Sequence, residues 1–284
     1  MIPRKRFEWK IRGQAFPLGE RTLIAGVLNI TPDSFSDGGR FLDPDAAFAQ
    51  AIALEDAGAD FLDIGAESTR PGATRISEGE ELRRLVPVLK RLQNKLAVPI
   101  SVDTYKAGVA AKAIELGVQI INDPTGLTFD PDLARAAAGG DTGLILNHMR
   151  GTPDTWTKLP PMKSPLVTIG HELQAAAHRA IRCGVDRKSI VLDPGLGFGK
   201  RKEQNAEILA HLNELMRLEM PVMVGASRKH FLPQASEDDS DYATAAAVTA
   251  SILNGAHLVR VHNVKAMKPV VDVADEILRN TVVE

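Results

Sequence analysis

Cysteine is almost missing from this chain, and its scarcity excludes two kinds of site. The 284 residues include one cysteine, Cys183. A single thiol can form neither an intrachain disulfide nor a metal site built on a cysteine cluster. This composition fits a reducing compartment, so we expect a cytoplasmic protein.

Long apolar runs and an excess of basic charge are missing too. No run approaches the roughly 20 apolar residues that span a bilayer, and the basic N-terminal segment lacks the apolar stretch of a signal peptide. The 34 basic and 36 acidic side chains give a formal net charge of -2, so no basic field attracts nucleic acid. We therefore expect a globular protein with neither a membrane nor a nucleic-acid partner.

The common nucleotide and zinc motifs are also missing. No Gly-x-Gly-x-x-Gly follows the first apolar run, which argues against a doubly wound dinucleotide-binding sheet. The segment 193–200 (DPGLGFGK) has three residues where a P-loop has four between its glycine and Gly-Lys. We interpret its glycines as letting the backbone approach a ligand, with Phe198 as an apolar wall. His171-Glu172 lacks the second histidine of a zinc-binding helix.

What the chain does have is eight short apolar runs at fairly even spacing, each ending at a polar or ionisable residue. Helical patterns lie between the runs, and four glycines stand where helices should end. This repeat predicts parallel strands with right-handed crossovers, and hence an α/β fold of the (β/α)8 barrel type. The runs are 23–29, 60–65, 98–103, 118–123, 143–148, 189–193, 221–229 and 257–262, and the glycines are Gly58, Gly117, Gly184 and Gly255.

The N-terminal segment 1–20 precedes the first run. Within it, residues 7–18 alternate loosely around Gly13 and predict a β-hairpin that caps the bottom of the barrel. No linker or low-complexity tract interrupts the chain, so we expect one domain over residues 1–284.

Helix starts and long loops can also be predicted. A capping box begins at Ser77, and the pairs Asp43-Pro44 and Asp130-Pro131 each combine an N-cap acceptor with a proline suited to the first turn. Long segments after the first, second, fifth and seventh runs should lie on the face where barrels carry out chemistry. These segments are 31–43, 65–77, 149–165 and 230–242.

Three runs end in a carboxylate or an amide, namely Asp103, Asn122 and Asp193. An Asp accepts paired N–H donors, whereas an Asn both donates and accepts, so together they suit a flat heterocycle such as a 2-amino-4-oxo pyrimidine. Lys229 could donate to a ring acceptor. The alternative is that some of these side chains cap the helices that follow. Asp63 also lies in a run, and we expect it to orient its neighbours.

A cationic group follows the last two runs. Arg260 and His262 leave the eighth run, and Arg228 and Lys229 leave the seventh. Loops in these positions are the usual phosphate site of this barrel, so we expect an anionic substrate group; the alternative is a solvated basic patch. Asn29, with Asp33 and Asp37 nearby, could hold a hard cation through oxygen atoms, and a diphosphate would make Mg²⁺ the natural choice.

Seven motifs in order resemble dihydropteroate synthase, the pterin-binding barrel family of folate synthesis. The resemblance covers residues from about 22 to 280, and the motifs are NITPDSFSDGG (29–39), ESTRPG (67–72), SVDT (101–104), IIND (120–123), LDPGLGFGK (192–200), SRK (227–229) and RVH (260–262). It implies a transferase that joins 4-aminobenzoate to 6-hydroxymethyl-7,8-dihydropterin diphosphate. Diphosphate would leave first, and the amine would then attack a pterin-methyl cation. The family is usually dimeric and is the target of sulfonamides.

The resemblance also implies roles for individual residues. Catalysis falls to Asp33, Asp37, Lys229, Arg260 and His262, with the two aspartates facing the developing cation. The pterin is held by Asp103, Asn122, Asp193 and Lys229; the diphosphate by Asn29, Arg260 and His262; Mg²⁺ by Asn29; and 4-aminobenzoate by Thr69, Arg70, Phe198 and Ser227. The first and second long loops are expected to close over the reactants.

Four residues depart from the usual family pattern: Ala66, Pro124, Arg150 and Asn263. None of them removes a residue with an implied role. Two alternatives stay open. One is a pterin-binding methyltransferase that acts on methyltetrahydrofolate, although such proteins should lack the diphosphate site and the STRPG and SDGG loops. The other is a non-catalytic pterin-binding paralogue.

Overall fold

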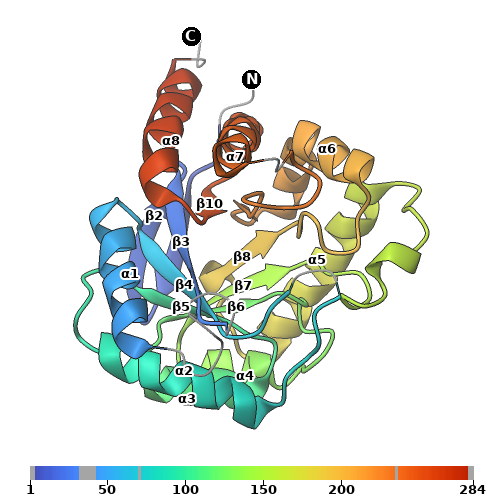
Figure 1. Ribbon diagram of the computed structural model, residues 1–284. Coiled ribbons are helices and arrows are strands. Elements are labelled where there is room, and N and C mark those ends of the chain that lie inside the picture. Colours follow the sequence, from blue (N-terminus) through green and yellow to red (C-terminus); the bar gives the residue numbers. More distant parts are fainter. Residues whose placement is uncertain (1–3, 32–42, 70–71, 234–235, 281–284) are drawn as a thin grey trace.

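Eight parallel strands form a nearly closed barrel ringed by helices (Figure 1). The computed structural model describes residues 4–31, 43–69, 72–233 and 236–280. The sheet has the order β8-β7-β6-β5-β4-β3-β10-β9, and a parallel bridge between Leu192 and Val222 joins its two edges. The predicted (β/α)8 barrel is therefore confirmed.

The predicted apolar runs coincide with the barrel strands. Each run contains one strand, and most strands are shorter than their run by one or two residues. The strands are β3 (Leu23–Asn29), β4 (Phe61–Gly65), β5 (Ile100–Asp103), β6 (Ile120–Asp123), β7 (Gly143–Asn147), β8 (Ile190–Asp193), β9 (Met223–Val224) and β10 (Leu258–Val261).

The helices lie outside the strands and bury apolar side chains against the sheet. Gly58, Gly117, Gly184 and Gly255 all take positive φ angles just after helices, as predicted from their positions. The helices are α1 (Pro44–Asp56), α2 (Glu78–Leu92), α3 (Ala107–Glu115), α4 (Leu133–Gly139), α5 (Pro165–Arg182), α6 (Lys202–Ala210), α7 (Glu237–Leu253) and α8 (Val264–Arg279), with 3-10 turns η1 (Trp156–Lys158), η2 (Arg187–Ser189) and η3 (Leu212–Leu218). Within the described ranges, none of the helices has the length and hydrophobicity of a membrane span.

Two of the three predicted helix caps are confirmed. Asp43 caps α1 with Pro44 as its first residue, and the Ser77 hydroxyl accepts from the Glu80 N–H at the start of α2. The Glu80 carboxylate accepts from Arg83 and Arg84 instead of completing the predicted capping box. The prediction for Asp130 was wrong, because α4 begins three residues later. The Asp130 carboxylate instead accepts from the N–H of Ala107, so it caps the neighbouring helix α3.

The segment after β9 is shorter than predicted. Three of its acidic residues, Glu237, Asp238 and Asp239, belong to the first turn of α7, which begins at Glu237 with Ser236 as N-cap. Negative side chains at a helix N-terminus oppose the helix dipole favourably, so this acidic tract is helical rather than loop.

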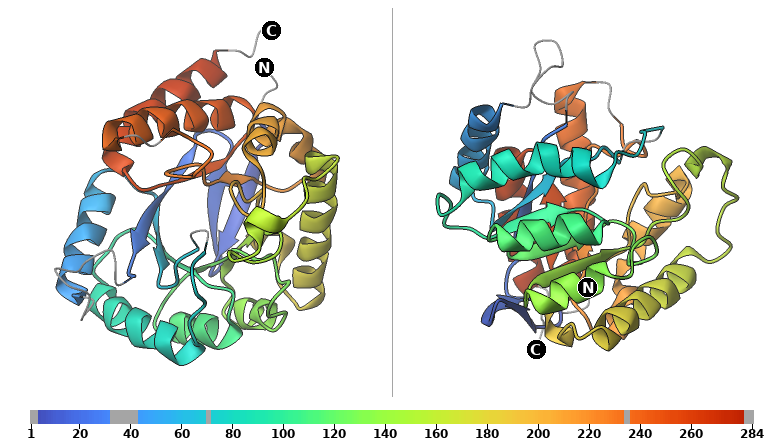
Figure 2. Two further views of the ribbon diagram at one scale, coloured as in Figure 1. Left: turned by 45° about the vertical axis from the view of Figure 1, so that its right-hand side comes forward. Right: turned by 90° about the horizontal axis from the view of Figure 1, so that it is seen from below.

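The N-terminal hairpin, β1 (Phe7–Ile11) and β2 (Gln14–Leu18), closes the bottom of the barrel as predicted. Trp9, Ile11 and Leu18 are buried against inward-facing residues of the strands. The Trp9 indole N–H donates to the carbonyl of Ser189 at 2.9 Å, which satisfies its one polar atom. Figure 2 shows this hairpin at the opposite end of the barrel from the long loop after β7.

Candidate active site

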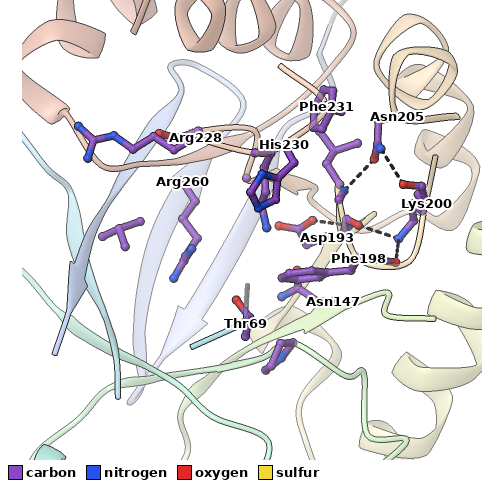
Figure 3. Close-up of a pocket in the computed structure, with 18 of the residues that line it drawn as sticks. Thr69, Asn147, Asp193, Phe198, Lys200, Asn205, Arg228, His230, Phe231 and Arg260 are labelled. Atoms are coloured by element: carbon purple, nitrogen blue, oxygen red, sulfur yellow. Dashed lines mark hydrogen bonds between the residues drawn. The ribbon is translucent and has the colours of Figure 1, made fainter. Parts of the chain in front are cut away.

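A cavity of about 800 Å³ opens at the C-terminal ends of the strands. Side chains from separate strands and loops point into it, among them Arg260, Asp193 and Phe198 (Figure 3). The structure brings together every predicted site residue that it describes: Asn29, Thr69, Asp103, Asn122, Asp193, Phe198, Ser227, Lys229, Arg260 and His262 all line this cavity. The predictions for Asp33, Asp37 and Arg70 lie outside the described residues.

A buried carboxylate, Asp63 of β4, joins its own strand to three others beneath the cavity. It is 1% exposed and accepts from the Ser101 hydroxyl at 2.6 Å, the Asn122 amide at 3.0 Å and Arg260 Nε at 2.5 Å. Charge-assisted hydrogen bonds of this kind are short and directional. Asp63 therefore orients its neighbours, as its position in the sequence suggested.

The network continues to both sides of Asp63. Arg260 also donates to Asp103 Oδ2 at 3.0 Å, and Asn147 donates to the amide oxygen of Asn122 at 2.8 Å. Burial raises the pKa of Asp103 to about 7, although the positive charge of Arg260 opposes this shift. Arg260 thus lies between two carboxylates, and its fork is fixed in the deep part of the site. Asn147, which ends an apolar run but received no role from the sequence, also lines the cavity.

Asp193 lies at the end of β8 with one oxygen already engaged. Its Oδ1 accepts from the backbone N–H of Gly195 at 2.7 Å. Burial raises its pKa to about 6, and the nearby charges of Lys229, Lys200 and Arg260 only partly offset that effect. A ligand that donates N–H groups to this carboxylate would relieve the unfavourable burial of its negative charge.

The glycine-rich segment after Asp193 wraps against neighbouring backbone. A Cβ atom at Gly195 would lie 2.1 Å from the carbonyl oxygen of His148, and one at Gly199 would lie 2.6 Å from that of Arg150. Both glycines have positive φ angles. Contact between backbone segments therefore already requires these two glycines, and both also line the cavity, so their service to ligand approach stays a prediction.

Lys200 holds this segment in place. Its buried ammonium donates to the carbonyls of His148, Gly195 and Phe198 at 2.9, 2.7 and 3.2 Å. Burial lowers the pKa of Lys200 well below its ordinary value. Three fixed carbonyl contacts set the position of the segment that carries Phe198, a role that the sequence motif did not reveal.

Phe198 and Lys229 stack at one wall of the cavity. The Lys229 ammonium lies 3.8 Å from the centroid of the Phe198 ring. Burial lowers the pKa of Lys229 to about 8. Trp156, from the loop after β7, also packs against Phe198, with a ring-centroid distance of 5.4 Å. Sequence reasoning missed Trp156, because a lone aromatic in a long loop follows no periodic pattern.

Asn29, His262 and Ser227 form a row at another wall. Asn29 Nδ2 lies 3.5 Å from His262 Nε2, and the Ser227 hydroxyl lies 3.0 Å from His262 Nδ1. The amide oxygen of Asn29 is on the side of Gly65. Among the residues that the structure describes, no group of three or more His, Cys, Asp or Glu side chains could hold a metal ion. A cation here would depend on Asn29 and on oxygen atoms of the substrate.

Two of the family departures have structural roles. Asn263 caps α8 through its amide oxygen and donates to Asp241 of α7 at 2.6 Å. Arg150 donates to the carbonyls of Pro160 and Gly199, which joins the loop after β7 to the glycine-rich segment. Ala66 is buried and Pro124 lines the cavity. None of the four displaces a predicted site residue.

Comparisons with known proteins identify the family. A family model described as pterin binding enzyme matches residues 25–262. The dihydropteroate synthase of Synechocystis is 41% identical over 268 residues and 93% of each chain. The chain belongs to the dihydropteroate synthase family. The Bacillus subtilis family member is 41% identical, over 91% of this chain and 90% of its own.

A solved structure of the family agrees in fold. The dihydropteroate synthase of Xanthomonas albilineans in complex with 7,8-dihydropteroate is 33% identical, with a TM-score of 0.82 over 94% of this chain and 97% of its own. This likeness agrees with the barrel fold seen here.

Proposed function

We propose that the protein is a dihydropteroate synthase. It condenses 6-hydroxymethyl-7,8-dihydropterin diphosphate with 4-aminobenzoate and releases 7,8-dihydropteroate and diphosphate. The observation that carries this proposal is a single cavity lined by two separate groups of polar side chains. Asp103, Asn122 and Asp193 offer a fixed set of acceptors and donors for a heterocycle, and Asn29 and His262 form a second polar group at the rim.

The pterin binds in the deep part of the cavity. The carboxylates of Asp103 and Asp193 accept from its amino and ring N–H groups, and the Asn122 side chain pairs with its remaining polar edge. Lys229 donates to a ring acceptor from its position over Phe198. Because Asp63 and Arg260 fix the surrounding side chains, the pocket is preorganised and loses little entropy when the ligand binds.

Departure of the diphosphate begins the reaction. Its negative charge increases as the bond to the pterin methylene breaks, and His262 and Arg260 stabilise that charge. The family implies Mg²⁺, and the donor set fits it in one respect. Asn29 offers one amide oxygen, and Mg²⁺ commonly takes one or two protein oxygens together with phosphate oxygens and water. Bound in this way, Mg²⁺ would neutralise part of the diphosphate charge.

The amine of 4-aminobenzoate then attacks the pterin-methyl cation. Thr69, Phe198 and Ser227 line the cavity beside the pterin pocket, and with Arg70 we assign them to this substrate. Asp33 and Asp37 face the cation and stabilise it. No protein nucleophile takes part, since the cation reacts directly with the amine. Closure of the first two long loops excludes water, which would otherwise compete with the amine.

We further propose that the protein is a cytoplasmic homodimer inhibited by sulfonamides. Val273 and Ile277, one turn apart on α8, are exposed apolar side chains, and apolar patches of this kind favour association. A structure of the Yersinia pestis family member contains a sulfonamide drug complex. The 36% identity to that protein over 97% of this chain supports competition between such drugs and 4-aminobenzoate here.

Diphosphate release, measured with and without 4-aminobenzoate, tests the reaction. A synthase releases diphosphate and forms pteroate in equal amounts when both substrates are present. Transfer of a methyl group from methyltetrahydrofolate, with no pteroate, would instead indicate a methyltransferase. Pterin binding without either reaction would indicate a non-catalytic paralogue.

A further inference from the structure

The loop after β4, residues 66–77, is held at both ends by a cluster of charged side chains outside the strand-end network. Glu67 lies at the start of this loop and lines the cavity. Its Oε2 accepts from the N–H of Ile76 at 3.3 Å, which joins the start of the loop to its end. A carboxylate thus closes the base of the loop that carries Thr69.

Lys106, at the N-terminus of α3, holds that carboxylate. Its ammonium donates to Glu67 Oε2 at 2.5 Å and also to the carboxylate of Glu81 on α2. The Tyr105 hydroxyl donates to the other oxygen of Glu67 at 2.9 Å. Side-chain exposure is 13% for Lys106, 11% for Glu67 and 1% for Glu81, so solvent screens these charges only weakly.

The cluster of Lys106, Glu67 and Glu81 contains more negative than positive charge. Two carboxylates share one ammonium, so loss of Lys106 would leave Glu67 and Glu81 close together with no cation between them. Like charges that are partly buried repel strongly. Glu81 is fixed on a helix, whereas Glu67 is on a loop, so Glu67 is the group that would move. Its hydrogen bond to Ile76 would be lost with that movement.

Other contacts hold the loop at further points. Arg84 of α2 donates to the carbonyl of Ala66 at 3.1 Å. Arg75 lies over the Phe129 ring, with its guanidinium carbon 4.0 Å from the centroid. The Gly72 N–H donates to the carbonyl of Pro153 in the loop after β7 at 3.1 Å. The base of the loop is therefore anchored to the barrel while Thr69 projects into the cavity.

We infer that Lys106 is a positioning residue for the second substrate: through Glu67 it fixes the start of the loop that presents Thr69 to 4-aminobenzoate. Lys106 itself does not line the cavity. The inference rests on the proposed function, because it assigns this loop to 4-aminobenzoate. It concerns mainly this substrate, since the pterin residues are held by the hydrogen bonds around Asp63, and the Lys106 cluster reaches them only through the charge of Glu81 on Asp103.

Steady-state kinetics of Lys106→Met tests the inference. We expect KM for 4-aminobenzoate to rise about tenfold, with kcat changed less than about threefold. The dissociation constant of the pterin diphosphate should stay within about twofold of the wild-type value. Lys106→Arg keeps the positive charge between the carboxylates and should restore KM. Lys112→Met, which removes an exposed lysine of the same helix, is the matched control and should change neither constant.

Thermal unfolding of each variant separates positioning from a merely structural role. If Lys106 only stabilised the fold, its replacement would lower Tm and would change KM for both substrates or for neither. If Lys106→Met does not fold, Tyr105→Phe removes a single hydrogen bond to Glu67 and should raise the same KM about threefold. An unchanged KM, or equal losses for both substrates, would overturn the inference. If the wild-type protein forms no pteroate, the proposed function fails and the inference fails with it.

Discussion

The bottom of the barrel and its top are built by the same strands from opposite kinds of side chain. At the bottom, inward-facing apolar residues pack against the hairpin; two positions further along five of the strands, the next inward-facing residue is polar. The pairs are Phe61 and Asp63, Ile120 and Asn122, Ile145 and Asn147, Val191 and Asp193, and Leu258 and Arg260.

This change from apolar to polar side chains within two residues separates the layer that stabilises the barrel from the layer that forms the site. A strand side chain returns to the same face every second residue, so one strand can supply an apolar layer and then a polar one. The apolar layer needs only volume and shape. The polar layer needs every buried donor and acceptor to find a partner, which the network around Asp63 provides. Substitutions in the apolar layer should therefore lower stability, whereas those in the polar layer should also impair ligand binding.

The largest expected effect is at the bottom. Trp9→Ala removes a side chain that is 1% exposed and packs edge-on against Phe61 at 5.8 Å. Such a truncation typically costs ~3–5 kcal/mol of unfolding free energy. Denaturant unfolding should show this loss, while KM for both substrates stays unchanged at a temperature where the variant is folded. Trp9→Phe, which leaves a smaller cavity, should lose less. A raised KM in folded Trp9→Ala would mean that the two layers are coupled.

Asp63→Asn should affect both stability and function. The variant keeps the size of the side chain but removes the charge that faces Arg260 at 2.5 Å. Breaking a buried ion pair from one side costs ~3 kcal/mol, and Asn122 loses an acceptor as well. We expect a lower midpoint of unfolding together with weaker pterin binding. Ser101→Ala, which removes only one hydrogen bond to Asp63, is the milder comparison; normal pterin affinity in Asp63→Asn would contradict the orienting role.

Sequence reasoning predicted the bottom and top layers unequally well. The strands and glycine exits followed from period and composition, because they depend on local backbone preference. The cavity residues followed from strand ends and family motifs. The contacts among them did not, since Arg260 meets Asp63 across 197 positions of sequence and nothing local encodes that pairing. For the same reason Asp130 was assigned to its own helix, whereas it caps a neighbouring one.

A smaller effect is expected from Asp193→Ala. The variant leaves the N–H donors of a bound pterin without an acceptor, which typically costs ~1–3 kcal/mol of binding free energy. Calorimetry with the pterin diphosphate should show this loss. Asp186→Ala, at an exposed carboxylate near the bottom of the barrel, should leave the affinity unchanged. An unchanged affinity in Asp193→Ala would remove this residue from the pterin pocket.

The smallest effect, and the one that most sharply distinguishes the two layers, is the response to pH. Burial raises the pKa of Asp193 to about 6, and only the ionised carboxylate accepts from a pterin. Binding should therefore weaken as pH falls, and Asp193 alone should weaken it about tenfold between pH 7 and pH 5. The effect of Asp193 on the free energy of unfolding changes with pH in the opposite direction. Because the pKa is raised on folding, the contribution of Asp193 to stability is present at pH values below its ordinary pKa and is lost as pH rises through 6.

Asp193→Asn tests both signs at once. Without a titrating group, this variant should lose its share of the pH dependence of pterin binding, measured by calorimetry at pH 5 and pH 8. Its unliganded form should be more stable than the wild type at pH 8 but not at pH 4, measured by denaturant unfolding. The polar layer would then sacrifice stability for affinity, whereas the apolar layer contains no group that could titrate. If Asp193→Asn keeps the full pH dependence of binding, the titrating carboxylate is another one, and Asp103, with its pKa of about 7, becomes the next to replace.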